Sequence, residues 1–142
     1  MGIVFKTGAS VTGPMVLVSH ADTATANNYW KIGIASDGRL FFEFNNSGTI
    51  ITINGSTMLE ANTVYYLLIA FDGTDTYLEL NGVEENPLTN ATPSVTAQGW
   101  LGAVDGSSVR LTLGAVETSA GASQFFNGSI GGVWLWDTDI TF

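Results

Sequence analysis

The feature that most constrains this chain is an alternation of apolar and polar residues with a period of two. The alternation is clearest over residues 76–83, where it runs into an Asn-Gly turn, and it recurs over residues 109–113. Successive side chains of a strand point to opposite faces, so this spacing predicts strands with one buried face. No window carries the 3.6-residue apolar spacing and the caps of a helix. The chain is therefore predicted to be all-β.

Turn signals separate the predicted strands. Asn and Asp tolerate positive φ and glycine adopts it freely, so Asx-Gly pairs close tight hairpins. The pairs are Asp37-Gly38, Asn54-Gly55, Asp72-Gly73, Asn81-Gly82, Asp105-Gly106 and Asn127-Gly128. We predict strands at 3–6, 15–19, 29–35, 38–45, 48–53, 63–72, 75–80, 109–114, 124–127 and 130–137, with long loops at 20–28, 84–100 and 115–123. This pattern predicts a two-sheet antiparallel jelly-roll sandwich, as one domain over residues 1–142.

Composition excludes two classes of partner. The net charge is −9, and the four basic residues are scattered, whereas nucleic-acid binding needs clustered Lys and Arg. The longest apolar run, residues 64–71, is too short to span a bilayer, which needs about 20 residues. We therefore expect no nucleic-acid partner and no membrane insertion. No segment after Met1 is laid out like a signal peptide, so we expect a mature fragment or another export route.

Five segments, in order, resemble a known family. They are 15–19, 29–34 with 36–42, 62–73, 77–83, and 113–114 with 126–136, the last ending in Val133-Trp134-Leu135-Trp136. In this order they resemble the laminin G-like branch of the concanavalin A-like lectin/glucanase superfamily. Two positions depart from it: Val64 stands where members often carry Trp, and Gly131 where many carry an acidic residue. The resemblance implies the sandwich fold and leaves several functions open, because one fold hosts many.

The acidic residues do not form the pattern of a glycoside hydrolase. The resemblance implies that a glucanase would carry two carboxylates on one strand facing a cleft, about 5 Å apart in a retaining enzyme. Glu79 stands alone on its strand, Glu43 has no acidic partner at i+2 or i+4, and Glu84 and Glu85 are adjacent, so they point to opposite faces. We therefore predict no catalytic residues and expect a protein that is not an enzyme.

Calcium is the one cofactor that the resemblance suggests. Related domains often bind Ca²⁺ through Asp side chains and loop carbonyls, and such hard oxygen ligands suit this ion. Asp22, Asp105 and Asp137 are the predicted ligands. The alternative is that each Asp makes an Asx turn in a loop rich in Gly, Ser and Asn.

The aromatic residues give the strongest indication of a binding surface. Trp134 and Trp136 lie two residues apart, which predicts that both face outward, while Val133 and Leu135 face the core. Two outward indoles could stack on a sugar ring or anchor an interface. The alternative is that a terminal segment, a loop or a neighbouring subunit covers them. Trp100 and Tyr29 are secondary candidates, and the parity of Trp30 places it in the core.

Three functional hypotheses follow. The first is a non-catalytic carbohydrate-binding or adhesion module of a phage virion or bacterial surface protein, with a glycan or cell-surface polysaccharide as partner. The second is a structural or assembly domain of a virion or tail protein, in which the Trp pair contacts another copy or another virion protein. The third, a glycan hydrolase, is disfavoured by the missing carboxylate pair. All three place the protein outside the cell or at a virion surface.

Overall fold

The structure is a computed structural model that describes residues 1–71, 76–85, 89–90, 104, 106 and 108–136. Within these residues no helix is long and apolar enough to cross a bilayer. The described strands are β1 (Gly2–Thr7), β2 (Met15–Asp22), β3 (Asn28–Ile34), β4 (Arg39–Asn46), β5 (Thr49–Met58), β6 (Val64–Phe71), β7 (Thr76–Leu80), β8 (Val83–Glu84), β9 (Thr89–Asn90), β10 (Val109–Leu113), β11 (Val116–Thr118), β12 (Gly121–Ser123) and β13 (Gly128–Trp134).

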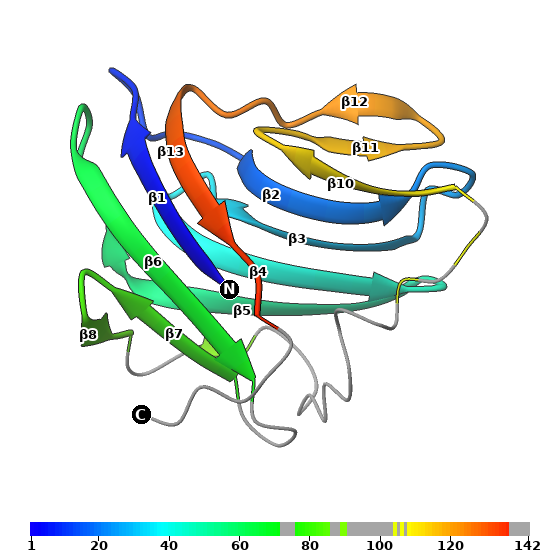
Figure 1. Cartoon of the computed structure of the whole chain (residues 1–142), viewed down its shortest axis with the longest axis horizontal. Coiled ribbons are helices and arrows are strands. Elements are labelled where there is room, and N and C mark those ends of the chain that lie inside the picture. Colours follow the sequence, from blue (N-terminus) through cyan, green and yellow to red (C-terminus); the bar gives the residue numbers. More distant parts are fainter. Residues whose placement is uncertain (72–75, 86–88, 91–103, 105, 107, 137–142) are drawn as a thin grey trace.

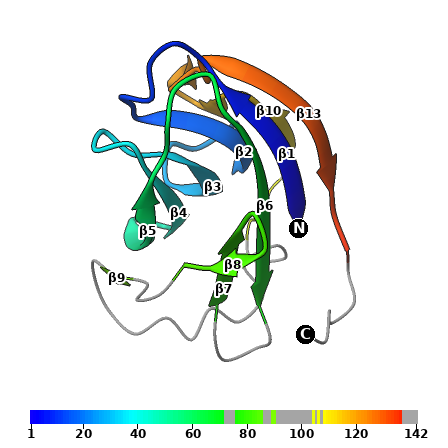
Figure 2. The same ribbon diagram turned by 90° about the vertical axis from the view of Figure 1, so that its left-hand side faces the viewer.

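The strands form two antiparallel sheets that pack as a sandwich (Figure 1 and Figure 2). Sheet A has the order β13-β1-β6-β7-β8, and sheet B has the order β10-β2-β3-β4-β5-β9. A separate two-stranded hairpin, β11-β12, lies beside β10 in Figure 1. The predicted all-β sandwich is therefore confirmed.

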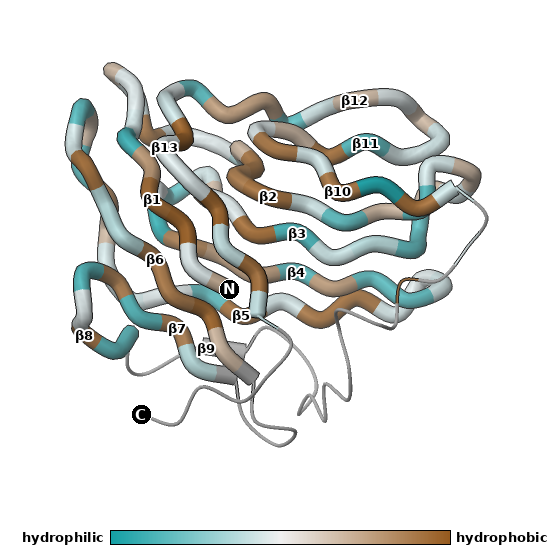
Figure 3. The backbone as a smooth tube through the Cα atoms, in the orientation of Figure 1, coloured by the Kyte–Doolittle hydropathy of each residue, from teal (hydrophilic) through white to brown (hydrophobic). Residues whose placement is uncertain are grey.

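The core lies between the two sheets and follows the predicted alternation. Alternate side chains of β1, β3 and β6 are buried, among them Ile3, Trp30 and Leu67, and Figure 3 shows apolar and polar residues along the strands. The largest fully buried side chains are Trp30, Phe5, Phe42, Ile3, Leu17, Ile32, Ile34, Leu40, Leu67, Ile69 and Leu78. Trp30 stacks on Phe42, with ring centroids 6.5 Å apart, so its predicted place in the core is confirmed.

Three details of the predicted strands are wrong. Residues 124–127 are not a strand, because Gln124 has φ 55° and turns the chain between β12 and β13. Residues 115–123 are not a plain loop, since they contain the β11-β12 hairpin. Strand β2 also runs on to Asp22, into the predicted loop 20–28.

The Asx-Gly pairs predicted hairpin turns correctly at Asp37-Gly38, between β3 and β4, and at Asn81-Gly82, and wrongly at Asn54-Gly55 and Asn127-Gly128. Asn81 and Gly82 both have positive φ and close the turn between β7 and β8. Asn54 and Gly55, in contrast, lie inside β5. There the glycine serves a close approach, because a Cβ on Gly55 would come within 2.8 Å of the Glu85 carboxylate.

Candidate functional site

The outer face of sheet A carries the two indoles that the sequence singled out. Trp134 ends β13 opposite Gly2 of β1, and Trp136 follows two residues later. The two side chains are 47% and 41% exposed. Neither ring stacks on another aromatic ring of the described residues. The predicted outward orientation of both side chains is confirmed.

Glycines form the floor beneath these indoles. A Cβ on Gly132 would come within 2.7 Å of the Trp134 ring, and a Cβ on Gly2 within 2.9 Å of the Trp136 ring. Each indole therefore lies close against a strand backbone, which only glycine permits. We call Trp134, Trp136, Gly2 and Gly132 the indole platform.

Other side chains of the same face surround the indole platform. Val4 pairs with Gly132 on one side and with Tyr66 on the other, so all three share the outer face. The Tyr66 hydroxyl lies 3.3 Å from the position of a Cβ on Gly2, so it reaches the edge of the platform. The face thus combines aromatic surface with a hydroxyl that can donate and accept hydrogen bonds.

Leu135 does not take the place predicted for it. The sequence placed it in the core beside Val133, but its side chain is 47% exposed. Val133 pairs with the fully buried Ile3 and packs partly against the core. Leu135 lies beyond the last paired residue of β13, so the chain there has left the sheet that would bury it.

The outer face of sheet B carries a different, polar cluster. Lys31 and Glu43 face each other across β3 and β4, with 2.9 Å between Nζ and Oε1. The Tyr29 hydroxyl donates to Glu43 at 2.7 Å, and Lys31 Nζ donates to Gln124 Oε1 at 3.1 Å. Burial, together with the Glu43 carboxylate, raises the pKa of Tyr29 to about 12. Tyr29 therefore belongs to the polar cluster on the outer face of sheet B, on the opposite side of the sandwich from the indole platform.

The β11-β12 hairpin covers part of this face of sheet B. Val116 of β11 is buried against Val16, Ala21 and Phe41 of the sheet. Ser19 Oγ donates to Ala115 O at 2.8 Å, which fixes the chain just before β11. Lys31 is only 7% exposed as a result, and its charge is compensated by the carboxylate and by the Tyr29 and Phe41 rings.

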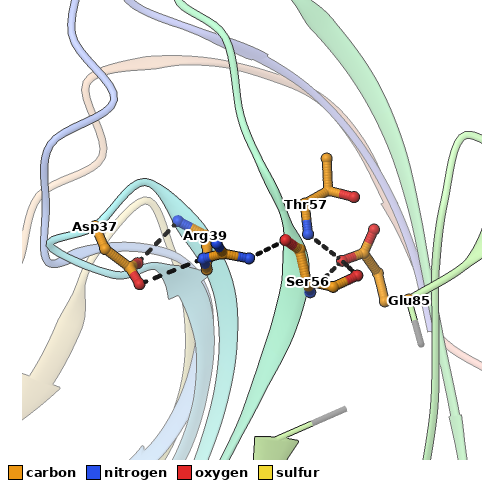
Figure 4. A network of polar contacts seen from close by, with 5 residues as sticks. All are labelled: Asp37, Arg39, Ser56, Thr57 and Glu85. Atoms are coloured by element: carbon orange, nitrogen blue, oxygen red, sulfur yellow. Dashed lines mark hydrogen bonds and ion pairs between the residues drawn. The ribbon is translucent and has the colours of Figure 1, made fainter. Parts of the chain in front are cut away.

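A third polar network connects the two sheets (Figure 4). Glu85 follows β8 of sheet A, and its Oε2 accepts hydrogen bonds from the Ser56 and Thr57 amides of β5 at 2.6 and 2.7 Å. Arg39 donates to the Ser56 carbonyl oxygen and lies beside Asp37. Desolvation raises the pKa of Glu85, but the hydrogen bonds from Thr57 and Ser56 outweigh it, so the pKa is lower than its ordinary value.

Two carboxylates of the described residues, Glu43 and Glu85, are used within the fold, whereas Glu79 and Glu84 face each other across β7 and β8. Glu84 is exposed and Glu85 is buried, as their adjacency in the sequence predicted. Glu43 is paired with Lys31, and Glu85 holds the β5 amides. Hydrolysis by two carboxylates would need a pair of acids facing one cleft. Among the described residues, neither Glu43 nor Glu85 forms a hydrogen bond with another acidic side chain.

Of the predicted calcium ligands, only Asp22 lies in the described part of the chain; Asp105 and Asp137 lie outside it, as does Trp100. Asp22 is buried, and its Oδ1 accepts the Ala24 amide at 2.9 Å, which makes an Asx turn. No group of three His, Asp or Glu side chains that could hold a metal occurs among the described residues. These donors do not fit a calcium site by themselves, and calcium binding stays a sequence prediction.

Comparison with known proteins settles the family. Residues 5–141 match the model of the concanavalin A-like lectin/glucanases superfamily. The chain belongs to this superfamily. The lectin-like fold predicted from the sequence is thereby confirmed over nearly the whole chain. No curated protein sequence gives a significant match.

Solved structures of carbohydrate-binding modules have a similar fold. The CBM40 of the Ruminococcus gnavus IT-sialidase bound to α2,3-sialyllactose superposes with a TM-score of 0.69 at 16% identity, covering 91% of this chain and 69% of that chain. The CBM40 without a named ligand gives 0.69 at 18% identity, covering 91% and 70%. The α2,6-sialyllactose complex gives 0.66 at 16% identity, covering 96% and 77%. At these identities the likeness shows the fold.

Proposed function

We propose that this chain is a non-catalytic carbohydrate-binding module whose ligand stacks on the indole platform. The observation that carries the proposal is the exposure of Trp134 and Trp136 on a glycine floor, with no ring of the described residues stacked on either. The C–H face of a pyranose ring is apolar and its edge carries hydroxyls, so it suits an indole with polar neighbours. The Tyr66 hydroxyl at the edge of the platform provides one such neighbour.

The charges of the chain favour a neutral glycan. Three of the four cations are already in ion pairs: Lys31 with Glu43, Arg39 with Asp37, and Arg110 with Glu117. Lys6 is the one Lys or Arg side chain with no ion pair among the described residues. The net charge of −9 also repels anionic ligands at low ionic strength. The proposed ligand is therefore an uncharged hexose chain, whereas the similar CBM40 structures hold sialyllactose.

Isothermal titration against neutral oligosaccharides and against both sialyllactoses tests the proposal. The Trp134→Ala/Trp136→Ala variant is expected to weaken binding of the neutral glycan by more than about 2 kcal/mol, roughly thirtyfold in Kd, because buried Trp residues dominate such contacts. Runs with calcium and with a chelator determine whether the ion contributes. An absence of binding to any neutral glycan would overturn the proposed ligand.

A matched variant on the opposite face locates the site. Glu43→Gln keeps the shape of the polar cluster on sheet B and is expected to leave glycan affinity unchanged. Loss of binding in Glu43→Gln with binding retained in the Trp variant would move the site to sheet B. A glycan-binding module meets its ligand outside the cell, so an extracellular location is part of this proposal. Residence in a virion stays a sequence prediction, on which the comparisons carry no information.

A further inference from the structure

The two indoles of the platform lie over different strands. The Trp134 ring lies back along its own strand, where its Cη2 is 2.7 Å from the position of a Cβ on Gly132. The Trp136 ring lies over β1, where its Cη2 is 2.9 Å from the position of a Cβ on Gly2. Figure 1 shows β13 and β1 side by side. The platform therefore has two separate stacking surfaces, one on each strand.

The strand register gives the separation of these two surfaces. Gly2 pairs with Trp134, and Val4 pairs with Gly132, so Gly2 and Gly132 are diagonal neighbours on the outer face. Diagonal neighbours of an antiparallel pair are about 7–8 Å apart. Within the described residues no ring contact joins the two indoles, so they do not form one stack. A pyranose ring that stacks on one indole is therefore too small to stack on the other as well.

The two stacking surfaces have different neighbours. The Tyr66 hydroxyl lies 3.3 Å from the same Gly2 Cβ position that the Trp136 ring approaches, so this hydroxyl adjoins the Trp136 surface. Gly132, beneath Trp134, is paired with the apolar Val4. A phenolic hydroxyl can donate and accept hydrogen bonds, whereas a valine side chain can do neither. The Trp136 surface thus has a polar edge, and the Trp134 surface has an apolar one.

The glycines meet only the far ends of these side chains. The atoms nearest to a Cβ on Gly132 are Cη2, Cζ2 and Cζ3 of Trp134, and those nearest to a Cβ on Gly2 belong to Trp136 and Tyr66. Neither glycine has a positive φ. Gly33 is the contrast, because a Cβ there would meet the backbone of a neighbouring strand. A methyl group at Gly2 or Gly132 therefore displaces a side-chain end and leaves the strands in place.

We propose that the indole platform holds two consecutive sugar residues of a neutral glycan chain, one on each indole, and that Gly2 and Gly132 are the positioning residues of these two subsites. The inference rests on the proposed function, because it concerns the same platform. The ligand class is a chain of at least two hexoses, since a single residue reaches only one indole. The sugar on Trp136 is the one that meets the Tyr66 hydroxyl.

Isothermal titration of the full chain with oligomers of glucose, galactose and mannose of one, two and four residues tests the number of subsites. In the series that binds, the disaccharide is expected to bind at least about tenfold more tightly than the monosaccharide, because two contacts share the cost of one association. Trp134→Ala and Trp136→Ala, made separately, should each remove this gain. Tyr66→Phe should weaken disaccharide binding only while Trp136 is present. Equal wild-type affinity for the monosaccharide and the disaccharide would overturn the two-subsite proposal.

Single methyl groups test the role of the glycines. Gly2→Ala and Gly132→Ala should each weaken disaccharide binding about tenfold, because a binding site tolerates only about 0.5 Å of displacement. Gly131→Ala is the matched control, since the nearest atom to its Cβ is Val4 Cγ1 at 3.5 Å, and it should bind like the wild type. Near-ultraviolet circular dichroism and acrylamide quenching of tryptophan fluorescence should change in the first two variants and stay unchanged in Gly131→Ala. Wild-type affinity and spectra in Gly2→Ala and Gly132→Ala would overturn the positioning role.

A double-mutant cycle separates positioning of the indole from a general loss of stability. Trp134→Phe shortens the side chain, so that its ring no longer reaches Gly132. In this background Gly132→Ala should cost no further affinity, whereas an equal loss in both backgrounds would overturn the positioning role. Urea denaturation checks that each variant is folded. If no oligomer binds the wild type, the proposed function fails as well; binding that is lost in Trp134→Ala/Trp136→Ala but kept in both glycine variants overturns only this inference.

Discussion

The two outer faces of the sandwich differ in what covers them. On sheet B the β11-β12 hairpin buries Val116 against the sheet, and the polar side chains beneath satisfy one another. On sheet A no described element crosses the indole platform, and Trp134 and Trp136 meet solvent. Substitutions on the first face should therefore change stability, while those on the second should change binding.

The largest expected effect on stability is on the outer face of sheet B, which the β11-β12 hairpin covers. Glu43→Ala leaves the Lys31 ammonium buried without its carboxylate and removes the acceptor of the Tyr29 hydroxyl. A buried charge that loses its partner typically costs about 3–5 kcal/mol, so urea denaturation should show a loss of this size. Glu117→Ala is the matched control, because it breaks an exposed ion pair with Arg110 and should cost under about 1 kcal/mol. Equal losses in the two variants would show that the hairpin does not shield Lys31.

An intermediate effect is expected where the two sheets are tied by Glu85. Glu85→Gln weakens hydrogen bonds from the Ser56 and Thr57 amides and should cost about 2 kcal/mol at pH 7. The pKa of Glu85 is lower in the folded state than its ordinary 4.5, so the unfolded chain takes up the proton first as pH falls. The stability that Glu85 contributes is thus present above pH 4.5 and is lost as pH falls below it. Denaturation of both proteins from pH 7 to pH 3 should show the difference shrinking in this window; a constant difference would contradict it.

The smallest effect on stability is expected on the outer face of sheet A, at the indole platform. Trp136→Ala should lower the free energy of unfolding by about 1 kcal/mol, because much of the indole is already in water. Urea denaturation of this variant would show the contrast with Glu43→Ala directly. A loss as large as that of Glu43→Ala would mean that Trp136 belongs to the core, and the indole platform would then be a packing feature.

Several features of the site could be predicted and others could not. The two-residue spacing was enough to predict that Trp134 and Trp136 face outward. Nothing in the sequence showed that Tyr29 would lie on the other sheet with Lys31 and Glu43, because a cross-strand partner depends on register. The hairpin over sheet B was missed because strands of three residues have too little alternation to be detected.

The sequence by itself determined the class of fold, because alternation and turn chemistry act over a few neighbouring residues and need no knowledge of distant partners. It likewise determined that the indoles point away from Val133. Only the tertiary structure decided which faces and edges stay uncovered, as the exposure of Leu111, Leu113 and Leu135 shows. The physical reason is that exposure depends on how far one sheet extends over the other, which is set by the pairing of strands remote in the chain.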